Sequence, residues 1–442
     1  MSSPLCRLIL IVVLVAGASA FGQAPPASSN VAGNVSIDLK EAVRRAQVYS
    51  QQFLSGTVGV AAAQELRKQA KSALLPSASL LSQYALTQPN GSDAGVFVAN
   101  NGTHEYIEQA TVHSDIFSVT RRAEYRKSIA AEATARARVD IAARGIVVAV
   151  AQNYYALLLA QRRLVNARNS LVEAQRFETL TQNQERGGEV ARADVVKAQL
   201  QREQRERDTL EAEVSIEKAK IGLAVLVFQD IDQAFSVLDD LKADLPLPEG
   251  AQEGMRALVE VNSPDIRAAE GTVTEAQHGV QSARGELFPV LSLDVFYGLD
   301  SNVVGIHNSS GQLNIGTAVV ASITLPVWNW GATRSRIRSA ELQRQQAEID
   351  LKQTRRDVRA TLESLALEVR VAQTQIGSLQ KSMDTASENL RLTNLRYQGG
   401  EALALEVVDA QNTAALARDA YDTGLSRYRI AVVNLQTLTG TF

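Results

Sequence analysis

The sequence predicts a mainly α-helical chain with a membrane β-barrel portion, in which two similar halves each hold a strand hairpin and long helices. Glycine and proline are scarce, at 27 and 10 of 442 residues. No proline lies between Pro89 and Pro246 or after Pro326, which favours long uninterrupted helices. Each half also contains segments that alternate apolar and polar residues, as strands do.

The N-terminus is predicted to be an export signal. Arg7 precedes an apolar run over Leu8–Val15, and an A-x-A cleavage pattern follows. We expect a signal peptide over 1–20, cleaved between about 20 and 24, and a flexible leader over 21–35. The single cysteine, Cys6, lies before the apolar run, so the mature chain would form no disulfide.

The first structural repeat is expected over 36–244. Pro76 ends the helical pattern with which the repeat begins. After it we expect a strand hairpin over about 77–119 and long helices over 122–186 and 189–228. A helix over 122–186 would be about 97 Å long at 1.5 Å per residue, longer than a globular core.

A linker is expected over 245–252, where prolines cluster, and a second structural repeat over 253–442. In it we expect a strand hairpin over about 290–325 and long helices over 332–398 and 401–438.

The two halves share recognisable segments. Residues 73–84 align with 286–297, and 187–199 align with 399–411, where seven of thirteen positions are identical. The spacing is almost the same for both pairs, which indicates that the whole unit is duplicated.

The predicted strands fit two kinds of protein. Leu291, Leu293 and Val295 alternate with polar residues, which suits a transmembrane strand with lipid on one side and water on the other. The same pattern suits a half-buried hairpin of a soluble protein. Polar, glycine-rich segments at 89–104 and 301–311 favour the membrane interpretation. Since four strands cannot close a barrel, the chain would then have to form a dimer, trimer or tetramer.

This plan resembles the TolC-type outer-membrane efflux proteins. The motifs that carry the resemblance are Ile37–Val43, Ser263–Glu270, Leu325–Trp328 with Gly331, and Tyr397–Gly400 followed by Glu406–Ala410. The resemblance implies a homotrimer in outer-membrane lipid, whose twelve-stranded barrel continues into an α-helical coiled-coil tunnel in the periplasm. It also implies passive export of solutes or proteins, delivered by an inner-membrane transporter and a periplasmic adaptor protein.

Two acidic residues are candidates for the periplasmic entrance of such a tunnel. Glu406 and Asp409 lie three residues apart and so on one helix face. They match the family's entrance carboxylates, and three chains would bring six carboxylates around one axis. The sequence alone favours a solvated pair on an outer face, and the resemblance reverses that preference.

Other candidates lie near the same turn. Asp194 and Tyr397 match a hydrogen-bonding pair that holds neighbouring coils together in the family, while Ala402 replaces the arginine of a second such contact. We expect four glycines to end helices as C-caps and, by resemblance, to present the turns to the adaptor; they are Gly187, Gly188, Gly399 and Gly400.

No enzyme, metal site or cofactor is expected, because the four histidines are scattered and no catalytic motif occurs. A net charge of −3 gives no reason to expect nucleic-acid binding. The alternative function is that of a secreted periplasmic coiled-coil protein, either structural or adaptor-like. It would share the signal peptide and helices but would not need two hairpins with a lipid-compatible face.

Overall fold

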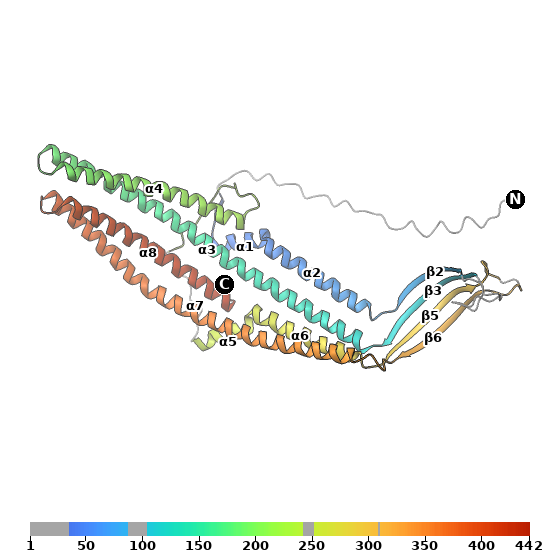
Figure 1. The fold of residues 1–442 in the computed structure, drawn as a ribbon. Coiled ribbons are helices and arrows are strands. Elements are labelled where there is room, and N and C mark those ends of the chain that lie inside the picture. Colours follow the sequence, from blue (N-terminus) through green and yellow to red (C-terminus); the bar gives the residue numbers. More distant parts are fainter. Residues whose placement is uncertain (1–34, 87–103, 242–251, 308–309) are drawn as a thin grey trace, which may run out of the picture.

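The molecule is elongated, with a sheet at one end and two helical hairpins at the other (Figure 1). A computed structural model describes residues 35–86, 104–241, 252–307 and 310–442. The expected signal peptide, nearly all of the leader and linker, and most of the 89–104 loop lie outside the described residues.

Each half supplies short helices, a strand hairpin and two long helices. The first half comprises β1 (Val35–Ile37), α1 (Leu39–Tyr49), α2 (Gln51–Ser72), β2 (Ser77–Leu86), β3 (His104–Phe117), α3 (Val119–Arg186), α4 (Arg192–Val227) and β4 (Phe235–Val237). The second comprises α5 (Gln252–Asn262), α6 (Pro264–Gly285), β5 (Val290–Ser301), β6 (Ile315–Thr324), α7 (Ala332–Gln398) and α8 (Ala404–Thr439).

Serine side chains set two helix boundaries that the sequence analysis did not place. The helical segment before Pro76 is divided at Ser50, whose hydroxyl accepts the Phe53 N–H at 3.5 Å. Ser263 does the same for Ile266 in the second half, at 3.4 Å and with the same φ of −66°. The α3 helix begins at Val119, three residues before the expected start, because Ser118 caps it.

Two short strands form a second sheet near the middle of the molecule. β1 pairs with β4 in parallel, although the two lie about 200 residues apart in the chain. The sequence analysis missed both, since strands of three residues carry too short a pattern. The hydroxyl of Tyr154 on α3 donates to the Leu238 carbonyl at 2.7 Å and so holds the end of β4 against the helix.

The largest apolar core surrounds the middle of α3, where Val150, Tyr154 and Tyr155 are fully buried against residues of α1, α4 and α8. Among the described helices, α3 is the one long and apolar enough to cross a membrane by length and composition, but 44% of that apolar window is buried. The buried core helix of a soluble protein passes the same test of length and composition.

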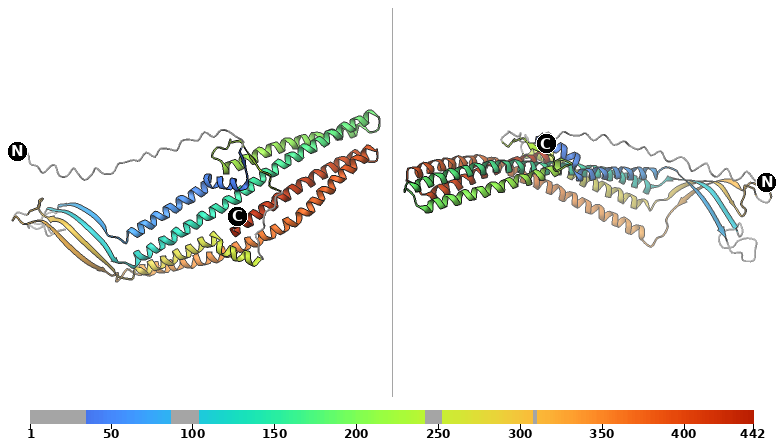
Figure 2. Two further views of the ribbon diagram at one scale, coloured as in Figure 1. Left: turned by 180° about the vertical axis from the view of Figure 1, so that it is seen from behind. Right: turned by 90° about the horizontal axis from the view of Figure 1, so that it is seen from above.

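The larger sheet joins the two halves. Its order is β2-β3-β5-β6 and every pairing is antiparallel, so β3 and β5 are central and β2 and β6 are the edges. Figure 2 shows the strands curving away from the line of the helices.

One face of the sheet is mostly apolar, although Ser82 and Glu108 also lie on it, and the other face is polar. The register aligns Leu80, Ala110, Tyr297 and Thr317 across the four strands, and alternation along each strand gives the rest of the apolar face. Its other large members are Tyr84, Val112, Leu291, Leu293, Val295, Val319 and Ile323. The polar face carries His113, Asp115 and Asp294.

Candidate functional site

The helical end of the molecule is formed by two glycine turns that lie together, far from the sheet (Figure 1). Gly187 and Gly399 end α3 and α7 with right-handed backbone angles, whereas Gly188 and Gly400 follow with φ of +77°. A left-handed residue at this place suits glycine, since it lacks Cβ. The expected C-cap geometry is therefore present at both turns, and each turn leads into the next long helix.

A small apolar cluster connects the two hairpins beside these turns. It contains Phe177 of α3, Ala198 of α4, Tyr397 of α7 and Val407 of α8. The rings of Phe177 and Tyr397 meet edge to face at 5.1 Å. Apolar contact therefore holds the hairpins together close to the tip.

Tyr397 is buried, and its hydroxyl donates to Thr181 Oγ1 at 3.2 Å. Burial raises the pKa of Tyr397 above its usual value, and the negative charge of Asp194 adds to that rise. The sequence analysis paired Tyr397 with Asp194 and missed Thr181, which lies in no recognisable motif.

Asp194 and Tyr397 line the same cavity of about 490 Å³, together with Gly399 and Gly400. Among the described residues, the Asp194 carboxylate has a different partner, the Lys197 ammonium at 3.8 Å. The two expected partners therefore lie around one cavity, but in this structure the tyrosine hydroxyl is bonded to Thr181.

The two candidate entrance carboxylates differ in their surroundings. Glu406 Oε1 accepts the Leu403 N–H at 3.1 Å, which caps α8, and its other oxygen lies 3.3 Å from Arg396 Nη1. The Asp409 side chain is exposed one turn further along α8. Of these two carboxylates, Glu406 is the one engaged by side-chain or backbone groups of the described residues.

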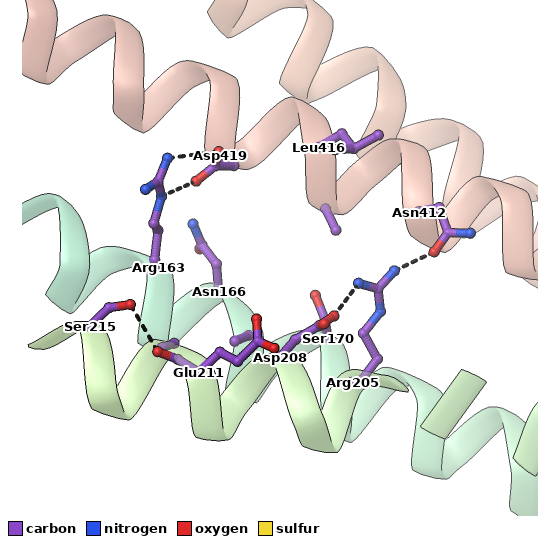
Figure 3. A pocket seen from close by; sticks show the side chains of 13 residues that line it. Arg163, Asn166, Ser170, Arg205, Asp208, Glu211, Ser215, Asn412, Leu416 and Asp419 are labelled. Carbon is purple, nitrogen blue, oxygen red and sulfur yellow. Dashed lines mark hydrogen bonds and ion pairs between the residues drawn. The ribbon is translucent and has the colours of Figure 1, made fainter. Parts of the chain in front are cut away.

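Arginines bridge the two hairpins behind the tip. A groove of about 700 Å³ lies between α3, α4 and α8. Figure 3 shows that Arg163 spans it at one end and Arg205 at the other. Arg163 pairs with Asp419 at 2.5 Å, and Arg205 bonds Asn412. These contacts join the hairpin of α3 and α4 to α8 along this stretch.

A polar cluster on the sheet was also missed. His113 Nδ1 lies 2.7 Å from Asp294, and its Nε2 lies 3.2 Å from Asp115, which in turn pairs with Arg121. The signal was not readable from the sequence, because the β3–β5 pairing joins residues 181 positions apart. In the part of the chain that the structure describes, no group of three or more His, Cys, Asp or Glu is arranged to hold a metal ion.

Comparison with known proteins shows which protein family the chain resembles. The family model described as outer membrane efflux protein matches twice, over 42–227 and 256–441. Curated relatives include the pyoverdine export outer membrane protein OpmQ of Pseudomonas aeruginosa, 28% identical over 68% of this chain and 62% of that protein. The cation efflux system protein CusC of Escherichia coli is 25% identical over 61% of this chain and 58% of its own. These matches therefore span about three fifths of those relatives' length.

Solved structures share the fold over most of this chain. The outer membrane protein VceC of Vibrio cholerae has a TM-score of 0.79 at 20% identity and covers 91% of this chain and 96% of its own. The CmeC outer membrane channel of Campylobacter jejuni has a TM-score of 0.80 at 18% identity, covering 91% and 85%. The family predicted from the sequence is confirmed. With the family model matching each half once, the chain belongs to the outer membrane efflux protein family.

Proposed function

We propose that the chain is one subunit of a passive conduit that crosses the outer membrane and the periplasm. The observation that carries this proposal is the four-stranded sheet, which has an exposed apolar face and, among the described strands, two edges paired on one side only. Such a sheet would be unstable alone, both in water and in lipid.

The apolar face fits the hydrocarbon layer of a membrane. Leu80 is 77% exposed and Ile323 is 75% exposed, and both lie on this face. β2 and β6 are each ten residues long, which is the length of a tilted transmembrane strand. The opposite face carries the His113 cluster and faces water in this arrangement.

Aromatic side chains mark both ends of this apolar face. Tyr84 lies 5.0 Å from the Tyr106 ring and bonds His104 at 2.8 Å, at the end away from the helices. Trp328 and Trp330 follow β6 at the other end, 76% and 90% exposed. Tyrosine and tryptophan are typical of the two membrane–water interfaces.

Closure of the barrel requires sister subunits. Backbone groups left unpaired at a lipid-exposed strand edge cost several kcal/mol each, and joining β2 of one subunit to β6 of the next satisfies both edges. Three subunits give twelve strands. Pairing of the edges alone is satisfied by two, three or four subunits, and the family resemblance selects the homotrimer.

The helices then form the periplasmic tunnel, and the glycine turns form its entrance. We assign the adaptor contact to the turns at Gly187–Gly188 and Gly399–Gly400. Asp194 and Tyr397 act at the same level to hold the hairpins together when the entrance is closed. The Asp409 side chains of the three subunits, together with those of Glu406, form a ring of carboxylates that attracts cations.

The inner-membrane transporter determines what is exported, and the conduit accepts what the adaptor delivers. Relatives of the chain include a pyoverdine export protein, a cation efflux protein and an alkaline protease secretion protein. Relatives named for such different exported substances support a passive role for the chain itself.

Two measurements test the proposal. The mature chain should fractionate with the outer membrane in cells, and the detergent-purified chain should give discrete channel conductance in planar bilayers. A periplasmic structural or adaptor-like protein would instead appear in the soluble periplasmic fraction and give no conductance. That result would contradict the proposal.

A further inference from the structure

A pocket of about 390 Å³ lies where α3 begins and α6 ends, at the junction between helices and sheet. Arg122 and Arg126 of α3 line one side, and Arg284 and Phe288 line the other. We name it the junction pocket.

The junction pocket is positively charged. Arg122 and Arg126 are one helical turn apart and exposed, and among the described residues neither has a carboxylate partner. Arg284 is neutralised by Glu341 at 2.8 Å. None of the described residues that line the pocket carries a carboxylate. Two adjacent guanidinium groups are therefore free to bind an anion.

The pocket opens beside the apolar face of the sheet. The Arg122 guanidinium lies over the Phe117 ring at 5.5 Å, and Phe117 pairs in register with Leu291 of the apolar face. Phe288, which lines the pocket, is 51% exposed. Cationic and apolar groups thus meet where the apolar face ends.

We propose that the junction pocket binds the headgroup of an anionic phospholipid, of the phosphatidylglycerol class, in the periplasmic leaflet. This inference rests on the proposed function, which places the end of the apolar face at the membrane surface. Arg122 and Arg126 donate N–H groups to the phosphodiester oxygens. Phe288 packs against the first methylenes of the acyl chains.

The test uses the detergent-purified full mature chain and native mass spectrometry. The titrants are dioctanoyl phosphatidylglycerol and the zwitterionic dioctanoyl phosphatidylcholine, with inorganic phosphate as a competitor. The pocket variant is Arg122→Gln/Arg126→Gln. The matched control is Lys352→Gln/Arg356→Gln, which removes the same charge at the same spacing from exposed positions of α7 outside the pocket.

We expect the pocket variant to bind phosphatidylglycerol about tenfold more weakly than the unchanged chain, as the loss of two charge-assisted contacts implies. The control should change less than twofold, phosphatidylcholine should bind weakly, and millimolar phosphate should not displace the lipid. Equal losses in both variants would show general surface attraction and overturn the proposal. Displacement by phosphate would show a free-anion site and would also overturn it.

Conductance separates this inference from the proposed function. Neither variant should alter it, because neither pair lies at the tip. Intact conductance with no difference in lipid binding would contradict the junction pocket alone. Absent conductance in the unchanged chain would contradict the conduit itself.

Discussion

Glu406 is held by two groups of its own chain, the Leu403 amide and the Arg396 guanidinium, whereas Asp409 is exposed. Removing Glu406 would therefore weaken a helix cap as well as change a charge. Asp409 reports on charge alone, so it is the better residue with which to test the entrance ring.

Asp409→Asn should weaken block of single channels by Mg²⁺ on the order of tenfold, about 1.4 kcal/mol, because three carboxylates leave one ring. The matched control is Glu401→Gln, which removes an exposed charge from the turn itself. Unchanged block in Asp409→Asn, or an equal change in both variants, would place Asp409 outside the ring.

Tyr155 is a second test at this scale. Burial, and then the charge of Asp240, raise the pKa of Tyr155 above its ordinary value of 10.0. The unfolded chain therefore loses this proton at a lower pH than the folded chain, and stability falls as the pH rises above about 10.

Tyr155→Phe should reduce that fall by about 1.4 kcal/mol per pH unit, the contribution of one proton. Denaturant unfolding between pH 9 and 12 measures the slope. The control Tyr49→Phe, at a tyrosine that is 41% exposed, should keep the original slope. A Tyr155→Phe slope equal to that of the unchanged chain would be inconsistent with a proton retained by burial.

The roles of some of these residues could be predicted from the sequence, and the roles of others could not. The glycines at the turns were found because their backbone role depends on their own identity. Thr181 and the partners of His113 were not found, because their roles depend on which helix or strand lies opposite. A resemblance gave Asp194 as the partner of Tyr397, but the hydroxyl bonds Thr181 in this structure.

At the scale of elements, the glycine turns allow a matched comparison. Gly400 has φ of +77°, whereas its neighbour Gly399 has a right-handed φ of −81°. An added Cβ would meet nothing within 4 Å at Gly400 and only carbonyl oxygens at 3.6 Å or more at Gly399. Steric contact with other residues is therefore equally mild at both positions, and backbone conformation alone distinguishes them.

Gly400→Ala should lower stability by roughly 1–2 kcal/mol, the cost of a left-handed alanine. Gly399→Ala should be nearly neutral or slightly stabilising. Thermal unfolding of the purified variants measures the difference. Equal transition temperatures for the two variants would mean that the turn can adopt another conformation.

The long helices and the four strands of the large sheet were predictable from periodicity and proline placement. The first residues of helices were harder to predict, as at α3, where Ser118 supplies the cap. Strands β1 and β4 were missed because they are defined by pairing with each other rather than by their own pattern.

At the scale of the whole molecule, duplication explains the architecture. Each half brings one hairpin, the central β3–β5 pairing joins the halves, and the outer strands remain as edges. The sequence predicts this plan because the repeat is visible in it. The need to pair β2 with β6 requires several subunits, and their number, three, is what the family resemblance implies.

The mass of the detergent-purified particle, from light scattering with the detergent contribution subtracted, tests this requirement most directly. The account predicts three chains per particle. Each chain has a mass of 47.7 kDa with the signal peptide and a lower mass without it. A monomer that stays dispersed in buffer without detergent would contradict it.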